Sequence, residues 1–227
     1  MFTTTAYETL FDAKTWKEPL HIIGVGGIGS HAARIAGKER FPVIHLHDGD
    51  VVEEKNMYNQ WFDDDSDIGL SKAEVVAKKV SQWTVAHAHP TYVEGHRKLS
   101  GVVCLCTGNT DPLPTIVESC VWDNPDVSLL LDARMDAEYV FLQVLDPRIE
   151  AHRKRWYRNW YPHSETENRT AGCGGGATAV GITASLAADL MVAQVIRYAA
   201  IRQGYKDTLD NHIEFFLRPL RIVTKQW

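Results

Sequence analysis

A glycine-rich turn between an apolar run and a small-residue segment most constrains the fold of this chain. The apolar run is LHIIG over residues 20–24, and residues 29–37, rich in alanine and glycine, have helical character. The glycines of the turn are Gly24, Gly26, Gly27 and Gly29. Glycines let the backbone approach a phosphate, and the helix that follows directs free N–H groups toward its charge. The motif predicts a strand–turn–helix unit that binds a nucleotide, and a tight turn without ligand is the competing interpretation.

Strands and helices are predicted to alternate along the rest of the chain. Strands are expected over 43–46, 102–106, 128–131 and 139–145, and helices over 72–80, 114–120 and 178–202. Continuous apolar strands are typical of a sheet covered on both faces. One or two further strands, interrupted at Pro219, are expected over 212–223. Residues 1–227 are therefore predicted to form one α/β, Rossmann-like domain with a mostly parallel sheet and helices on both faces.

Residues 147–177 interrupt the alternation and are predicted to form a long loop, a lid or crossover segment. They are polar, aromatic and glycine-rich. Basic residues stand among the aromatic ones at Arg148, Arg153, Lys154, Arg155 and Arg158. Three interpretations stay open for this run: a solvated helix face, a lid that contacts phosphates, or a strip for an acidic partner or nucleic acid.

Composition excludes several classes of protein. The net charge of −5 argues against nucleic-acid binding, and no apolar run appears long enough to span a bilayer, so a cytoplasmic, soluble protein is expected. The four cysteines lack the spacing of structural zinc sites, and Cys104, Cys106 and Cys120 are predicted to lie in the core. The histidines near strands, His21, His45 and His47, lack further metal ligands at sensible spacing and are interpreted as structural.

Asp48 ends the second predicted strand, where its carboxylate can accept hydrogen bonds from both ribose hydroxyls. The glycine turn and Asp48 alone fit either ATP or NAD(P). Asn56, Gln60 and Lys72 then follow, with Asp67-Ile-Gly before the lysine. A dehydrogenase has no reason to place an amide pair and a lysine at these intervals.

From Ile22 to Val80 the sequence resembles the ThiF/MoeB-like adenylyltransferases, relatives of the ubiquitin-activating enzymes. That family combines a GxGGxGS loop, an Asp ending the second strand, an Asn-x-x-Arg-Gln element, Asp-Ile-Gly and a lysine. The resemblance implies ATP and Mg²⁺ as cofactors and no structural zinc. It implies a homodimer that activates the C-terminal glycine of a small ubiquitin-like or sulfur-carrier protein as an acyl-adenylate.

The resemblance also implies residue roles. Gly26, Gly27 and Gly29 would cradle the phosphates, Asp48 would hold the ribose, and Asn56, Gln60 and Lys72 would meet the phosphates. A solvated lysine in the first turn of a helix is the competing interpretation of Lys72.

Two further residues are candidates for catalysis. Arg134 matches the family's Asp/Arg turn, or forms an ordinary ion pair with Asp132. Cys173 would form a thioester or persulfide after adenylation, or is a small residue that fills a tight turn.

The sequence departs from the family pattern at three places. Asn59 replaces the family arginine, Gly108 replaces the magnesium-binding aspartate, and residues 1–20 contain no arginine. Asp111 is a substitute candidate for Mg²⁺, and a helix cap or turn residue ahead of Pro112 is its competing interpretation. Three hypotheses follow. The chain is an active adenylyltransferase, a nucleotide- or partner-binding pseudoenzyme, or an NAD(P)-binding enzyme.

Overall fold

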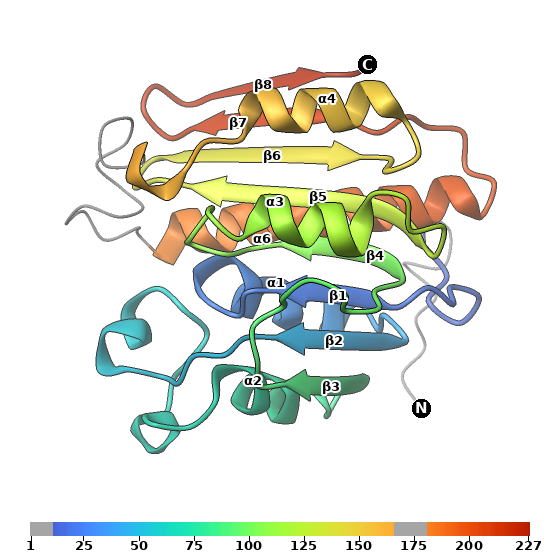
Figure 1. Ribbon diagram of the computed structural model, residues 1–227. Helices are drawn as coiled ribbons and strands as arrows, with labels where there is room; N and C mark the ends of the chain where they lie inside the picture. The colour runs from blue at the N-terminus through green and yellow to red at the C-terminus, as the bar shows by residue number, and fades with distance from the viewer. Residues whose placement is uncertain (1–10, 166–180) are drawn as a thin grey trace.

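One eight-stranded sheet runs through the structure, a computed structural model that describes residues 11–165 and 181–227 (Figure 1). Its strands are β1 (Leu20–Ile23), β2 (Val43–His47), β3 (Val85–His89), β4 (Gly101–Leu105), β5 (Val127–Met135), β6 (Tyr139–Leu145), β7 (His212–Phe216) and β8 (Arg221–Lys225). They lie in the order β3-β2-β1-β4-β5-β6-β7-β8. The pairs from β3 to β5 are parallel, and β5 to β8 pair antiparallel. The predicted Rossmann-like, mostly parallel sheet is confirmed.

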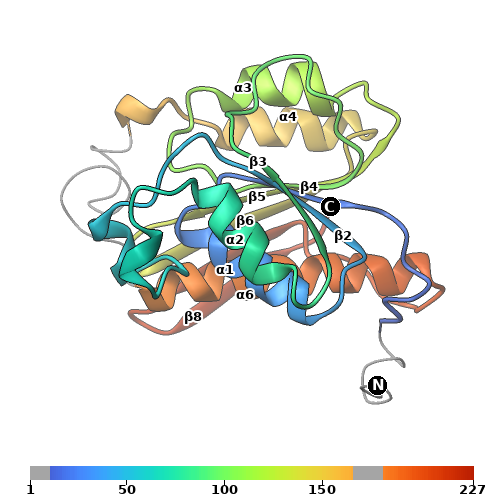
Figure 2. The same ribbon diagram turned by 90° about the horizontal axis from the view of Figure 1, so that it is seen from below.

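Helices cover both faces of this sheet, as expected (Figure 2). One face carries α1 (Gly27–Lys38), α2 (Lys72–Val80) and α6 (Gly181–Arg202). The other carries α4 (Glu150–Asn159) and α3 (Leu113–Ile116), which continues as a π-helical turn, Val117–Val121. Short 3-10 turns lie at Glu54–Tyr58, Asp65–Asp67 and His163–Glu165. Two apolar cores result, one on each face.

The prediction of a loop over 147–177 is wrong for α4. The fully buried side chain of Trp156 and the buried side chain of His152 lie one helical turn apart and anchor α4 to the sheet. The basic residues of the run obscured this apolar stripe. Residues 166–177 lie outside the described residues.

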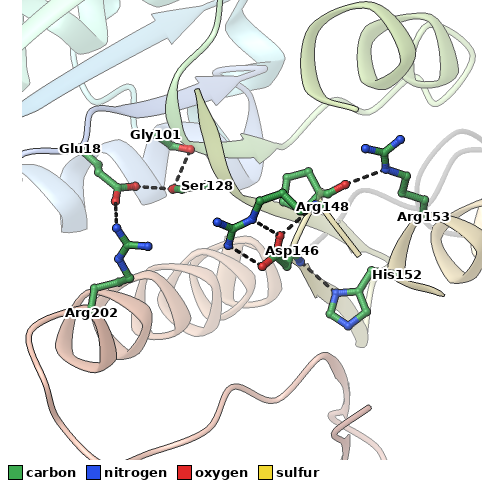
Figure 3. Close-up of polar contacts among 9 residues, drawn as sticks. Glu18, Gly101, Ser128, Asp146, Arg148, His152, Arg153 and Arg202 are labelled. Atoms are coloured by element: carbon green, nitrogen blue, oxygen red, sulfur yellow. Dashed lines mark hydrogen bonds and ion pairs between the residues drawn. The ribbon is translucent and has the colours of Figure 1, made fainter. Parts of the chain in front are cut away.

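Two basic residues of the predicted lid, Arg148 and Arg153, are held by polar contacts (Figure 3). Arg148 binds the carboxylate of Asp146 through two side-chain nitrogens, and Arg153 donates to the carbonyl of Pro147 at 2.6 Å. Residues 146–148 follow β6 at the edge of the sheet where the parallel strands begin. On the same edge Glu18 accepts from Ser128 and pairs with Arg202 of α6. The geometry therefore disfavours the phosphate-lid interpretation for these arginines.

Helix α6 is an exception to the expectation that no apolar run of the chain is long enough to span a bilayer. By length and composition alone, Gly181–Arg202 passes that test, but 56% of its most apolar window is buried inside the structure. It packs against α1, β5 and β6, which accounts for its composition. The three cysteines Cys104, Cys106 and Cys120 are buried in the core as predicted.

Candidate functional site

A cavity of about 640 Å³ lies at the carboxyl ends of the parallel strands. This volume is typical of small-molecule sites, and such sites form at this edge of α/β sheets. The residues that line this cavity include Gly24, Gly26, Gly27, His47, Asp48, Asp50, Gln60, Lys72, Tyr92, Glu94, Gly108, Arg134, Met135 and Tyr161.

Two glycines of the turn are required by close approaches of the backbone. Gly24 has φ +89°, and a Cβ there would lie 2.8 Å from the carbonyl oxygen of Cys106. A Cβ on Gly29 would lie 1.8 Å from the carbonyl oxygen of Gly24. Gly29 therefore lets α1 begin tight against the turn and is not among the cavity-lining residues. The other three glycines of the turn line the cavity.

Asp48 is fixed across the glycine turn. One carboxylate oxygen accepts a hydrogen bond from the backbone N–H of Val25 at 2.6 Å, and the other accepts from that of Asp50 at 2.8 Å. Burial raises the pKa of Asp48, and the two backbone donors partly offset that shift. A carboxylate has about four acceptor sites, so two stay free for ribose hydroxyls.

Lys72 is buried at the wall of the cavity. Its helix begins with Ser71, whose hydroxyl oxygen accepts from the backbone N–H of Glu74 at 3.4 Å. The Lys72 side chain is only 8% exposed, and its ammonium lies 3.0 Å from a carboxylate oxygen of Asp50. The interpretation of Lys72 as a solvated lysine is therefore wrong.

The two predicted amides have different environments. Gln60 lines the cavity, and its amide oxygen is shielded from solvent without a hydrogen-bond partner. A buried acceptor of this kind is satisfied when a ligand donates to it. Asn56 does not line the cavity; its side-chain oxygen accepts from the backbone N–H of Glu53 at 2.8 Å and caps the 3-10 turn. Its predicted phosphate contact has no support in this geometry.

Arg134 lines the cavity and also forms the ion pair that was the competing interpretation. Its Nη2 lies 2.6 Å from the carboxylate of Asp132, and its Nη1 donates to the carbonyl of Asn159 at 3.0 Å. The guanidinium lies 5.0 Å from the ring centroid of Tyr161. Burial alone would lower the pKa of Arg134, but the ion pair with Asp132 raises it. Arg134 thus presents a rigid, permanently charged guanidinium to the cavity.

The predicted metal ligand lies elsewhere. Asp111 accepts from the backbone N–H of His163 at 2.7 Å and is not among the cavity-lining residues. Gly108 does line the cavity, and a Cβ built on it meets nothing within 4 Å. Within residues 11–165 and 181–227, no group of three or more His, Cys, Asp or Glu side chains could hold a metal ion. Mg²⁺ commonly binds one or two carboxylates together with nucleotide phosphates, and Asp50 is a cavity-lining carboxylate that fits this use.

Sequence reasoning missed several lining residues. Asp50, two residues after Asp48, could have been found from its position beyond the same strand. Tyr92 and Tyr161 gave no signal, because they reach the cavity from loops far along the chain. Cys173 lies outside the described residues.

Five histidines form a ladder beneath one end of this cavity. His21 of β1, His45 and His47 of β2, and His87 and His89 of β3 stack across the strands. His21 shares a 3.0 Å hydrogen bond with His47, and His45 shares one with His89. The stacked rings of His21 and His45 are nearly parallel, 8° apart, so their nitrogens do not converge on one point. These mutual contacts are consistent with the interpretation of His21, His45 and His47 as structural.

A model of the ThiF family matches residues 13–218 of this chain. Over 91 residues the chain is 33% identical to the NEDD8-activating enzyme E1 catalytic subunit of Caenorhabditis elegans, a match covering 37% of this chain and 21% of that protein. Among solved structures, Escherichia coli MccB with ATP has a TM-score of 0.65 at 16% identity, covering 92% of this chain and 64% of that one. PaaA has a TM-score of 0.64 at 13% identity, over the same shares.

These relatives differ from the chain in length. It spans about a fifth of the curated relative and just under two thirds of MccB and PaaA. The family match nevertheless extends from before β1 into the turn between β7 and β8, and it includes the glycine turn, Asp48, Gln60 and Lys72. This chain belongs to the ThiF family.

Proposed function

We propose that this protein is an ATP-dependent adenylyltransferase that activates the C-terminal glycine carboxylate of a small ubiquitin-like or sulfur-carrier protein. The observation that carries the proposal is the convergence of Asp48, Gln60 and Lys72 with the glycine turn around one cavity. The relatives support a protein or peptide substrate: one is a NEDD8-activating subunit, and MccB has been crystallised with MccA.

The residues that line the cavity have different roles in adenylation. A carboxylate oxygen of the substrate attacks the α-phosphorus of ATP, the bond to the β-phosphate breaks, and pyrophosphate leaves. Asp48 and the turn hold the nucleotide, and the ammonium of Lys72 stabilises the charge that develops on the phosphates. Mg²⁺ bound with ATP would neutralise further phosphate charge, with Asp50 as the side chain to hold it.

One observation favours a pseudoenzyme as the second candidate. Gly108 stands at the cavity where the family has its magnesium aspartate, so the chain offers one carboxylate fewer to the phosphates. A pseudoenzyme would bind ATP at the same residues without transferring the adenylyl group.

ATP–pyrophosphate exchange with glycine-ended carrier proteins separates the two candidates. The wild type is expected to exchange, and Lys72→Ala to lower the rate by roughly 10²–10³-fold, the usual effect of removing one transition-state donor. Lys78→Ala is the matched control, because Lys78 is an exposed lysine of the same helix. ATP binding without exchange in the wild type would favour the pseudoenzyme. Gly108→Asp, which the open space accommodates, should then restore exchange.

A further inference from the structure

The ammonium of Lys72 has a carboxylate partner within the chain. Asp50 contacts Lys72 twice: its carboxylate lies 3.0 Å from the ammonium, and its backbone carbonyl accepts from the backbone N–H of Lys72 at 3.0 Å. The lysine side chain is 8% exposed, whereas that of Asp50 is 48% exposed. The carboxylate thus lies at the open side of the buried ammonium.

Tyr92 fixes the position of Asp50. Its hydroxyl donates to the carboxylate oxygen that does not face Lys72. The Tyr92 ring lies over Gly49, where a Cβ would come within 2.7 Å of it. Burial alone would raise the pKa of Asp50, but the Tyr92 hydroxyl and Lys72 together lower it. The carboxylate is therefore ionised at neutral pH and oriented by Tyr92 and Lys72, and the backbone N–H of Asp50 is held by the carboxylate of Asp48.

The charged residues that line the cavity explain why the ion pair between Asp50 and Lys72 affects phosphate binding. Among the described lining residues the acidic side chains are Asp48, Asp50 and Glu94, and the Lys and Arg side chains are Lys72 and Arg134. Arg134 is already neutralised by Asp132. A triphosphate therefore depends on Lys72 for a side-chain cation, and Asp50 competes for that ammonium.

We propose that Asp50 is a positioning residue that holds Lys72 at the cavity wall, and that phosphates of the bound nucleotide displace it from the ammonium. The proposal rests on the proposed function for the identity of the ligand. Lys72 exchanges one oxygen partner for another, so the lysine is kept ordered before ATP arrives. The exchange sets the affinity for phosphates and leaves the affinity for the nucleoside unchanged.

Calorimetry of Asp50→Asn with ATP and with adenosine, in EDTA to exclude metal ions, tests this exchange. Asn keeps the shape and loses the charge that competes for Lys72. ATP should bind roughly 3- to 10-fold more tightly than to the wild type, as expected for release of a partly exposed ion pair and removal of its repulsion, and adenosine should bind equally. Glu54→Gln, which removes an exposed charge outside the cavity, should change neither affinity. Unchanged or weaker ATP binding in Asp50→Asn would overturn the proposal.

The Lys72→Met background and an inorganic triphosphate probe distinguish failure of the proposed role of Asp50 from failure of the proposed function. Lys72→Met removes the ion-pair part of the gain and leaves the repulsion part, so Asp50→Asn should tighten ATP binding less in the Lys72→Met background than in the wild type. If the wild type binds neither ATP nor adenosine, the proposed function fails, and inorganic triphosphate then serves as the probe. Tighter triphosphate binding by Asp50→Asn would still support the exchange. Equal binding, or no binding by either protein, would refute it.

Discussion

At the scale of single residues, Asp48 combines a structural contact with a predicted ligand contact. Its carboxylate joins the glycine turn to the loop after β2 through two backbone N–H groups. Asp48→Ala should weaken ATP binding by roughly 1.5–3 kcal/mol, the cost of losing hydrogen bonds to a charged group. Calorimetry with ATP measures this loss.

The control for this prediction separates fold from binding. Asp64→Ala removes an exposed carboxylate outside the cavity and should leave ATP affinity unchanged. Circular dichroism should show that Asp48→Ala keeps its secondary structure. ATP affinity equal to that of the wild type in the folded variant would contradict the assignment of Asp48 to the ribose.

Residues of the site differed in how far sequence could place them. Asp48 and Lys72 follow or begin regular elements, so their positions at one edge of the sheet follow from strand and helix boundaries. Asn56 lies in a 3-10 turn, where a local hydrogen bond from Glu53 sets its side-chain direction, and Asp111 lies in a loop, where a hydrogen bond from His163, 52 residues away, does so. The contact between Tyr92 and Asp50 joins residues 42 apart, and no local pattern encodes it.

At the scale of elements, the histidine ladder makes strands β1 to β3 sensitive to acid. Burial, with smaller contributions from neighbouring histidines and Arg97, lowers the pKa of His21 to about 3 and that of His47 to about 2. The unfolded chain binds these protons near pH 6.5, whereas the folded protein excludes them until far lower pH. The contribution of these histidines to stability is therefore complete above pH 6.5 and is lost progressively as the pH falls below 6.5.

The size of this loss can be measured. Each of the two histidines should lower the free energy of unfolding by about 1 kcal/mol between pH 6.5 and about 5.5, because the unfolded-state imidazole is only half protonated at the upper end, so together they should lower it by roughly 2 kcal/mol. Urea unfolding across this range measures it. Replacing His21 and His47 together by Leu should reduce the dependence by about this amount, and His96→Gln, an exposed control, should not. An unchanged slope in the double variant would contradict the assignment.

The same strands show why some elements escaped prediction. Strand β3 is VAHAH, in which alanine and histidine replace the apolar β-branched residues that mark a strand. Its pairing with β2 rests on stacked imidazoles, which composition alone does not reveal as a packed face. Helix α4 was hidden in a similar way by basic residues around its two buried side chains.

At the scale of the whole molecule, the apolar composition of α6 no longer requires a partner subunit. The helix is covered by α1 and the sheet within one chain. Apolar exposure is instead found on the β7–β8 hairpin, where the side chain of Leu220 is 74% exposed and that of Ile222 is 57% exposed. Fully burying a side chain of this size stabilises a contact by about 1.5–3 kcal/mol. The hairpin thus offers apolar surface that a second copy would bury.

We predict a symmetric homodimer that covers this hairpin. Sedimentation velocity at micromolar concentration should give twice the 25.6 kDa of one chain. Joint replacement of Leu220 and Ile222 by Asp should shift the protein toward the monomer, because charge at a buried contact is costly. Tyr205→Ser, another exposed apolar residue outside the hairpin, should leave the dimer intact. A monomeric wild type would contradict the dimer itself, whereas a dimer that survives the Asp variant would place the interface on another surface.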